Sequence, residues 1–152
     1  AYAARFSVAR PRSDLWSTFG DLGRGLALAA WIHFALADTG DGWAWTAATL
    51  MPVSQAARAH ARRHDVIADR ALERSVWWYN RDLAAPGLLP PTAGMTPLPA
   101  ERSLWDLAPL GGGVLGGLLT GLLTNDTGWV VTGILLGTSI GNGFADRQLH
   151  PD

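Results

Sequence analysis

The amino-acid sequence predicts an all-α, polytopic membrane protein. We expect two helical hairpins of the same polarity, about four transmembrane helices in all, with a long cytoplasmic amphipathic helix between them. Three observations predict this class: two apolar stretches are each broken once by a polar turn, the two stretches resemble each other, and the arginines gather on one predicted side of both. Helices this apolar would need burial on all sides in a soluble protein, whereas lipid covers them in a bilayer.

The composition narrows the class of protein. Hydrophobic residues make up 48% of the 152 residues and charged residues only 16%, and the chain has no cysteine. A disulfide framework, a catalytic thiol and a cysteine-based metal site are therefore excluded. The net charge of −1 argues against a nucleic-acid partner. All basic residues are arginines, and together with the high alanine and glycine content this favours a bacterial source.

The first elements in chain order are a basic N-terminal arm at 1–14 and a transmembrane hairpin at 15–57. Pro11, Ser13 and Asp14 predict that the first helix starts near the end of the arm. The turn of the hairpin is expected at 38–42, where Asp, Thr and Gly cluster. The second helix should kink at Pro52 and continue past the membrane as one long helix.

A cytoplasmic amphipathic helix is predicted at 58–82, followed by a Pro-rich linker at 83–102. One face of this helix is mainly apolar, so we expect it to contact the inner lipid surface, a partner helix or its own chain. The five prolines of the linker exclude a regular helix or strand there. The residues predicted for the contact face are Ile67, Ala71, Leu72, Val76, Trp78 and Tyr79.

A glycine-rich transmembrane hairpin is predicted at 103–147, with a short tail at 148–152. Ser103 followed by Asp106 is typical of a capped helix start. Each apolar arm would cover about 25 Å as a helix, slightly less than a bilayer core. Glycines recur every four residues on both arms and so share a face on which another helix packs closely, within the chain or between copies. These helix-packing glycines are Gly113, Gly117, Gly121, Gly133, Gly137 and Gly141, and replacing Gly117 or Gly137 by leucine should disrupt assembly.

The two hairpins look like a duplicated unit with both termini on the cytoplasmic side. Asp38-Thr39-Gly40 matches Asp126-Thr127-Gly128, and both are followed by a Trp-led apolar arm, as in membrane proteins built from parallel repeats. The turns carry acidic residues and no arginine. Eleven of the twelve arginines fall on the opposite side, which predicts insertion in the bacterial inner (plasma) membrane with that side cytoplasmic. These are Arg5, Arg10, Arg12, Arg58, Arg62, Arg63, Arg70, Arg74, Arg81, Arg102 and Arg147.

Few residues suggest chemistry. His60 and His64 share a helix face with metal-ligand spacing, but three arginines beside them would repel a cation, so we expect no metal site. His33 is an ionisable group in a predicted transmembrane helix, and packing with a hydrogen bond is favoured over a proton relay. No nucleophile with a base and no phosphate-binding loop is recognisable. We therefore expect no catalytic residues and no cofactor.

The function predicted from these features is that of a non-catalytic, small integral membrane subunit. It would pack through its glycine-rich helix faces into a larger membrane assembly, with the lipid bilayer and other membrane subunits or copies of itself as partners. One alternative is a self-assembling pore or holin-like permeability protein, in which hydroxyl and amide side chains line water. A second alternative is a helical structural component of a large soluble or phage-type oligomer.

Overall fold

A computed structural model describes residues 2–37, 41–83 and 97–149 of the chain. These residues are 91% helical and contain no strand, so the predicted all-α class with four helices is confirmed. The helices are α1 (Tyr2–Ala37), α2 (Gly42–Leu83), α3 (Ala108–Leu123) and α4 (Thr127–Leu149), and a short 3₁₀ helix, η1 (Leu104–Leu107), precedes α3. The central part of the predicted linker, 84–96, and part of the first turn, 38–40, lie outside the described residues.

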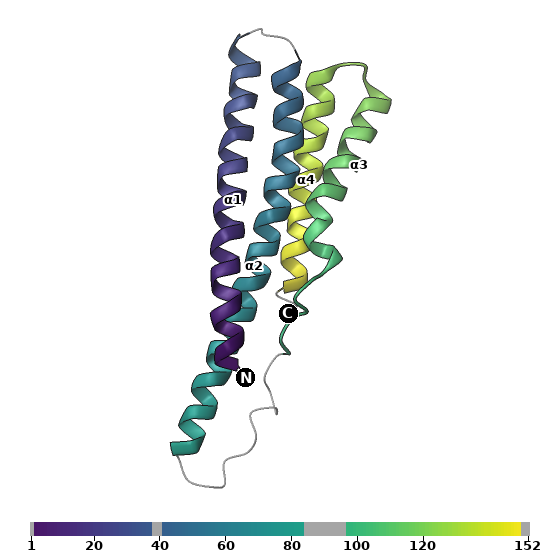
Figure 1. Cartoon of the computed structure of the whole chain (residues 1–152). Helices are drawn as coiled ribbons and strands as arrows, with labels where there is room; N and C mark the ends of the chain where they lie inside the picture. The colour runs from purple at the N-terminus through teal and green to yellow at the C-terminus, as the bar shows by residue number, and fades with distance from the viewer. Residues whose placement is uncertain (1, 38–40, 84–96, 150–152) are drawn as a thin grey trace.

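The helices form two antiparallel hairpins that stand side by side (Figure 1). Helix α2 packs against α1 on one side and against α4 and α3 on the other, so it is the central element of the bundle. The starts of α2 and α4 lie at the same end, where Thr127 Oγ1 donates a hydrogen bond of 2.9 Å to Asp41 Oδ2. The two hairpins therefore run in the same direction.

Helix α1 begins earlier than the sequence predicts. It starts at Tyr2 and includes Pro11, so residues 2–14 belong to the helix and are not a separate arm. Proline disfavours a helical residue before it, which is why the sequence pointed to a start near Ser13. Packing outweighs this local preference, because Phe6 and Ala9 contact Ile67 and Ala68 of α2.

Helix α2 continues through Pro52, as predicted for one long helix, while the kink expected at Pro52 stays a prediction. Its 42 residues correspond to about 63 Å, and the 36 residues of α1 to about 54 Å. Helices α3 and α4, with 16 and 23 residues, are much shorter. The first hairpin therefore extends well beyond the second at the end that carries the N-terminus (Figure 1).

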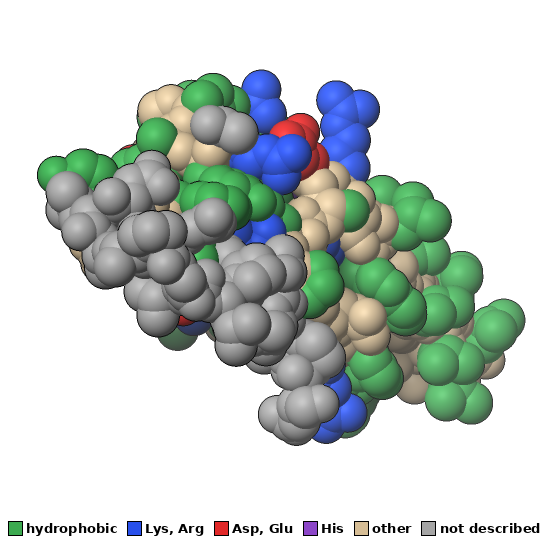
Figure 2. All heavy atoms as spheres, turned by 90° about the horizontal axis from the view of Figure 1, so that it is seen from below, with side chains coloured by type: hydrophobic (Ala, Val, Ile, Leu, Met, Phe, Trp, Pro, Cys, Tyr) green, Lys and Arg blue, Asp and Glu red, His purple; other side chains and the backbone are tan. Residues whose placement is uncertain are grey.

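Small residues fill the inside of the bundle, and large apolar residues cover its outside. The buried hydrophobic residues are mostly alanines, whereas Leu36, Leu122 and Leu123 are each more than 80% exposed. Among the described helices, one stretch, Leu104–Leu123, is long and apolar enough to cross a membrane, and few of its residues are buried. The predicted set of about four transmembrane helices therefore stays a prediction. Seen from the end opposite the turns, arginines gather beside acidic residues and apolar side chains spread along the flank (Figure 2).

Candidate functional site

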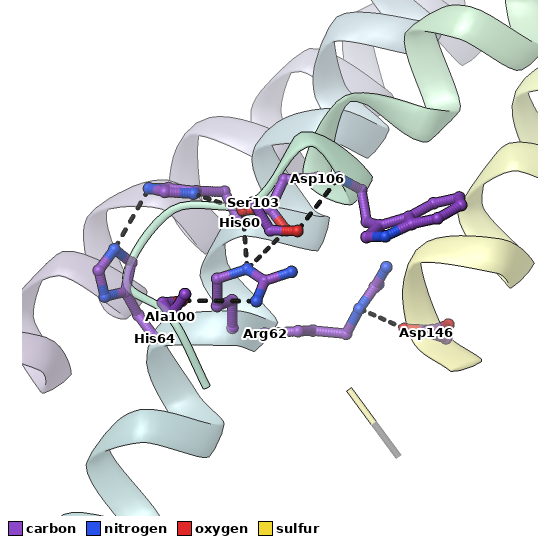
Figure 3. A network of polar contacts seen from close by, with 9 residues as sticks. His60, Arg62, His64, Ala100, Ser103, Asp106 and Asp146 are labelled. Carbon is purple, nitrogen blue, oxygen red and sulfur yellow. Dashed lines mark hydrogen bonds and ion pairs between the residues drawn. The ribbon is translucent and has the colours of Figure 1, made fainter. Parts of the chain in front are cut away.

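The most densely connected polar groups lie at the end of the bundle opposite the turns, and we call His60, Arg63, His64 and Asp106 the base cluster (Figure 3). Ser103 begins η1, since its Oγ accepts a hydrogen bond of 3.2 Å from the backbone N–H of Trp105. This turn directs Asp106 toward α2, where its side chain is 8% exposed. Arg63 Nε donates to both carboxylate oxygens of Asp106, at 2.7 and 3.0 Å. A buried, charge-assisted pair therefore joins α2 to the start of the second hairpin.

Hydrogen bonds continue from Asp106 through both histidines. His60 Nδ1 lies 3.0 Å from Asp106 Oδ2, and because the carboxylate only accepts, this nitrogen carries the proton. In the neutral ring His60 Nε2 is then an acceptor, so His64 Nε2–H donates to it across 3.2 Å. His64 Nδ1 is left as a buried acceptor without a hydrogen-bond partner among the described residues. Burial, followed by electrostatic interactions with His60 and Arg12, lowers the pKa of His64.

Three arginines of α2 bind three different elements, and we call these contacts the base ion pairs. Arg58 pairs with Asp21 of α1 at 3.3 Å, Arg62 with Asp146 of α4 at 2.7 Å, and Arg63 with Asp106 of η1 at 2.7 Å. Arg62 Nη2 also donates to the side-chain oxygen of Asn142. From sequence, these arginines were interpreted as a basic face that would repel a metal ion. The missed signal is that each of the other three elements has an aspartate where its apolar segment ends.

The glycines of the second hairpin contact one another within the chain. A Cβ atom added to Gly116 would collide with the carbonyl oxygen of Gly133, and one added to Gly137 with that of Gly112. Gly141 is equally close to the carbonyl oxygen of Ala108. Helices α3 and α4 therefore approach backbone to backbone along this line, which we call the glycine seam.

The predicted series on α3 lies beside the glycine seam. Gly113 and Gly117 are buried, with Thr138 and Ile134 of α4 as their neighbours, and Gly113 also faces Pro52 of α2. Gly121 is exposed and has only an ordinary contact with Val130. On α4 the predicted residues Gly133, Gly137 and Gly141 all lie in the seam. Their partners on α3 are Gly116, Gly112 and Ala108, and the two glycines lie one residue away from the predicted series.

The predicted contact face of the amphipathic helix divides into two parts. Ile67 and Ala71 are buried, and Ile67 packs on Ala9 of α1. This part contacts its own chain, one of the three expected surroundings. The remaining residues of the face are exposed, and they are Leu72, Val76, Trp78 and Tyr79.

An apolar groove of about 590 Å³ lies beside the base cluster, between α1, α2 and η1. Trp16, Phe19, Val53, Leu107 and His60 are among its lining residues. The ring of Trp16 contacts the ring of His60 edge-on, with 5.3 Å between centroids. Within the described ranges, no group of three or more His, Cys, Asp or Glu side chains is placed to hold a metal ion.

His33 lies at the other end of the molecule, where its exposed ring contacts the ring of Trp43 edge-on at 4.7 Å. It shares no contact with the base cluster.

Comparisons of the chain with protein-family models, with curated proteins and with solved structures find no match.

Proposed function

We propose that the chain is a small integral membrane protein with a non-catalytic, accessory role in a membrane assembly. The observation that carries this proposal is a charge-free belt around all four helices. The belt comprises residues 25–37, 42–57, 108–123 and 127–145, none of which is Asp, Glu or Arg. Its outer surface is covered by exposed Leu, Ile, Val, Phe and Trp side chains.

The thickness of the belt suits a bilayer. Helix α2 rises about 24 Å between Gly42 and Arg58, close to the roughly 30 Å of a hydrocarbon core. The base ion pairs bring Asp21, Asp106 and Asp146 to the level of the α2 arginines, and the Asp41–Thr127 hydrogen bond aligns the opposite end. Polar groups that limit the belt at both ends of α2 and α4 are the pattern that a membrane imposes.

The arginines give the orientation. Eleven of the twelve lie at or below the base ion pairs, and Arg24 lies about one turn above Asp21, whereas the other end has Asp41 and Asp126. The positive-inside rule therefore favours a cytoplasmic base in the bacterial inner membrane, with both ends of the described chain on that side. Trp43, Trp45 and Trp129 would then lie at the outer interface, where indole rings are favoured.

The accessory role is supported by how the polar groups are used. The charged side chains of the base bind one another across helices, which is a structural use of them. Because the glycine seam is occupied within the chain, contact with other subunits falls on other surfaces. The exposed apolar residues Leu72, Val76 and Tyr79 of α2, below the belt, are the part of the predicted contact face that remains open to a partner.

Labelling of single cysteines tests the topology, because the natural chain has none. Asn125→Cys in the outer turn should react with a membrane-impermeant maleimide in intact spheroplasts. Gln148→Cys at the base should react only in inverted vesicles. Leu119→Cys in the belt should react in neither, and all three replaced residues are exposed, so their substitution leaves the packing unchanged.

Extraction with alkaline carbonate and purification in mild detergent complete the test. The protein should stay in the membrane pellet and purify together with other membrane proteins or as a defined oligomer. Release by carbonate together with equal labelling at all three positions would contradict the proposal and favour a soluble oligomer. Ion leakage from liposomes containing the pure protein would instead favour a pore.

A further inference from the structure

A second, smaller groove of about 200 Å³ lies below the base ion pairs, between α1, α2 and the segment that leads to η1. Arg5 and Arg12 line it from α1, His64 from α2, and Glu101 from the leading segment. Arg5 and Arg12 are seven residues apart, so two helical turns place them on the same face of α1. The function proposed above makes no use of this groove.

The two arginines of this groove differ from their neighbour Arg10. Arg10 pairs with Asp65 at 3.1 Å and lies 3.8 Å from Asp14. Arg5 and Arg12 have no ion pair within the described residues, and both are exposed. Two uncompensated guanidinium groups therefore border a cavity that holds a single carboxylate, so its charge favours an anion.

His64 supplies the second unexplained feature. It is 4% exposed, and its Nδ1 atom has no hydrogen-bond partner among the described residues. A buried polar atom without a partner costs free energy. The hydrogen bonds from Asp106 through His60 make this atom an acceptor while His64 is neutral. Protonation of Nδ1 would turn it into a donor, which an anion in the groove could accept.

We propose that this groove binds a phosphate-class anion, held by the guanidinium groups of Arg5 and Arg12 and by a proton that His64 takes up on Nδ1 from solvent. Arginine matches the geometry of phosphate oxygens and forms charge-assisted hydrogen bonds to them. Nδ1 itself is covered, so binding requires a small shift of the groove wall, which includes the exposed side chains of Arg12 and Glu101.

The charged surroundings of His64 make binding dependent on pH. The groups that face it are Arg5 and Arg12 from α1, His60 and Arg63 from α2, Glu101 from the leading segment and Asp106 from η1. When the groove is empty, the burial of His64 and its interactions with His60 and Arg12 hold the pKa of His64 below its usual value. A bound anion opposes all three effects and raises this pKa, so affinity should increase as pH falls.

The position of the groove below the belt allows the phosphate-class anion to come from either of two sources. His64 lies six residues beyond Arg58 on α2, about 9 Å below the belt, which is the level of lipid headgroups in the proposed orientation. The anion is therefore a lipid phosphate or a free phosphate. Only the lipid source depends on the proposed membrane function.

Titration of the full chain in neutral detergent with inorganic phosphate, followed by ¹⁵N NMR of the histidine rings, tests the groove. Phosphate should bind saturably and shift the Nδ1 resonance of His64 toward the protonated form. Arg12→Gln and Arg5→Gln should each weaken binding about tenfold, the usual loss of one charge-assisted hydrogen bond. Arg147→Gln is the matched control, because it removes an equal charge from an exposed helix position outside the groove.

A second titration separates the sources by using phosphatidylcholine nanodiscs with and without phosphatidylglycerol. A His64 shift with phosphatidylglycerol alone, lost in Arg12→Gln, supports the groove and identifies a lipid phosphate. A shift with inorganic phosphate alone supports it with a free anion, and shifts with both support one site that accepts either. No His64 shift in any titration, or equal losses in Arg12→Gln and Arg147→Gln, would overturn the proposal even if the protein proves to span a membrane.

Discussion

The two hairpins have the same polarity but are held together differently. In the first hairpin the buried residues along the contact of α1 and α2 are mainly alanine and serine side chains, with Ala27, Ala44 and Ser54 at most 1% exposed. In the second hairpin the glycine seam brings the backbones of α3 and α4 into direct contact. The contact between α1 and α2 is therefore made by small side chains, and the contact between α3 and α4 by main-chain atoms.

This difference matches the different lengths and surroundings of the hairpins. The second hairpin lies almost entirely within the charge-free belt. In the proposed membrane location, helix association there would depend on close van der Waals contact, because lipid is as apolar as the side chains. The first hairpin extends beyond the belt and carries the three arginines that bind α1, η1 and α4. The second hairpin is therefore held by its own backbone, while the first supplies the charges that join the two.

The largest loss of stability is expected when the ion pair between Arg63 and Asp106, which joins the two hairpins, is broken. Asp106→Asn leaves the guanidinium of Arg63, whose side chain is 5% exposed, without its counter-charge. Removing one partner of a buried ion pair costs about 3–5 kcal/mol, so the free energy of unfolding in a denaturing-detergent titration should fall by that amount.

Asp146→Asn is the matched control for this prediction. The Arg62–Asp146 pair also joins two helices, but its side chains are 32% and 45% exposed, so its loss should cost less than about 1 kcal/mol. If the two substitutions lower the free energy of unfolding equally, burial does not determine how much each ion pair contributes to stability.

Adding one methyl group to each hairpin tests the difference in packing. Gly137→Ala places a Cβ against the backbone of Gly112, which cannot move aside, and overpacking of this kind costs about 1–3 kcal/mol. Gly23→Ala in the first hairpin meets only Ser54, whose Cβ lies 3.0 Å from the added atom, so a shift of a few tenths of an ångström accommodates it and the free energy of unfolding should change by less than about 1 kcal/mol.

Gly111→Ala is the control for helix propensity, because open space surrounds that position. It should stabilise the protein slightly, since alanine favours a helix over glycine by about 1 kcal/mol in water. If Gly137→Ala behaves like Gly111→Ala in thermal unfolding, the glycine seam does not determine the stability of the second hairpin.

The pattern of apolar segments and polar turns made most of the fold predictable, but it did not predict where α1 begins. The apolar segments, their polar turns and the absence of Gly and Pro from 56–79 led to four helices and to a long α2. Helix α1 was placed too late, because the local effect of Pro11 is visible in the sequence while the packing of Phe6 on α2 is a long-range contact. Tertiary packing decides between two local conformations of similar free energy.

The candidate site was less predictable than the fold. Glycine spacing marked the right helices, but Gly112 and Gly113 are adjacent, and only the crossing of α3 with α4 determines which of them touches the other backbone. The base cluster was missed because Asp106 was interpreted as part of a helix cap. Its partners lie more than 40 residues away, and no local pattern reports them.

Protonation of His64 should destabilise the first hairpin at low pH. Its pKa is lower in the folded than in the unfolded chain, so between the two pKa values the unfolded state binds more protons. The free energy of unfolding should therefore decrease as pH falls below about 6.5, the ordinary histidine pKa, until the lowered pKa is passed. His64→Gln should flatten this part of the pH profile in phosphate-free buffer.

The smallest effect is expected at the opposite end, where an exposed hydrogen bond joins Thr127 at the start of α4 to Asp41 just before α2. Thr127→Val removes the donor to Asp41 and should lower the free energy of unfolding by about 0.5–1 kcal/mol. Thr132→Val is the control, because the Thr132 hydroxyl bonds only to the Gly128 carbonyl of its own helix. A cost at Thr127 that exceeds the cost at Thr132 would mean that the hairpins are coupled at both ends of the belt. Equal costs would assign the coupling to the base ion pairs and to the packing of α2 on α4, and would leave the turn end free to separate.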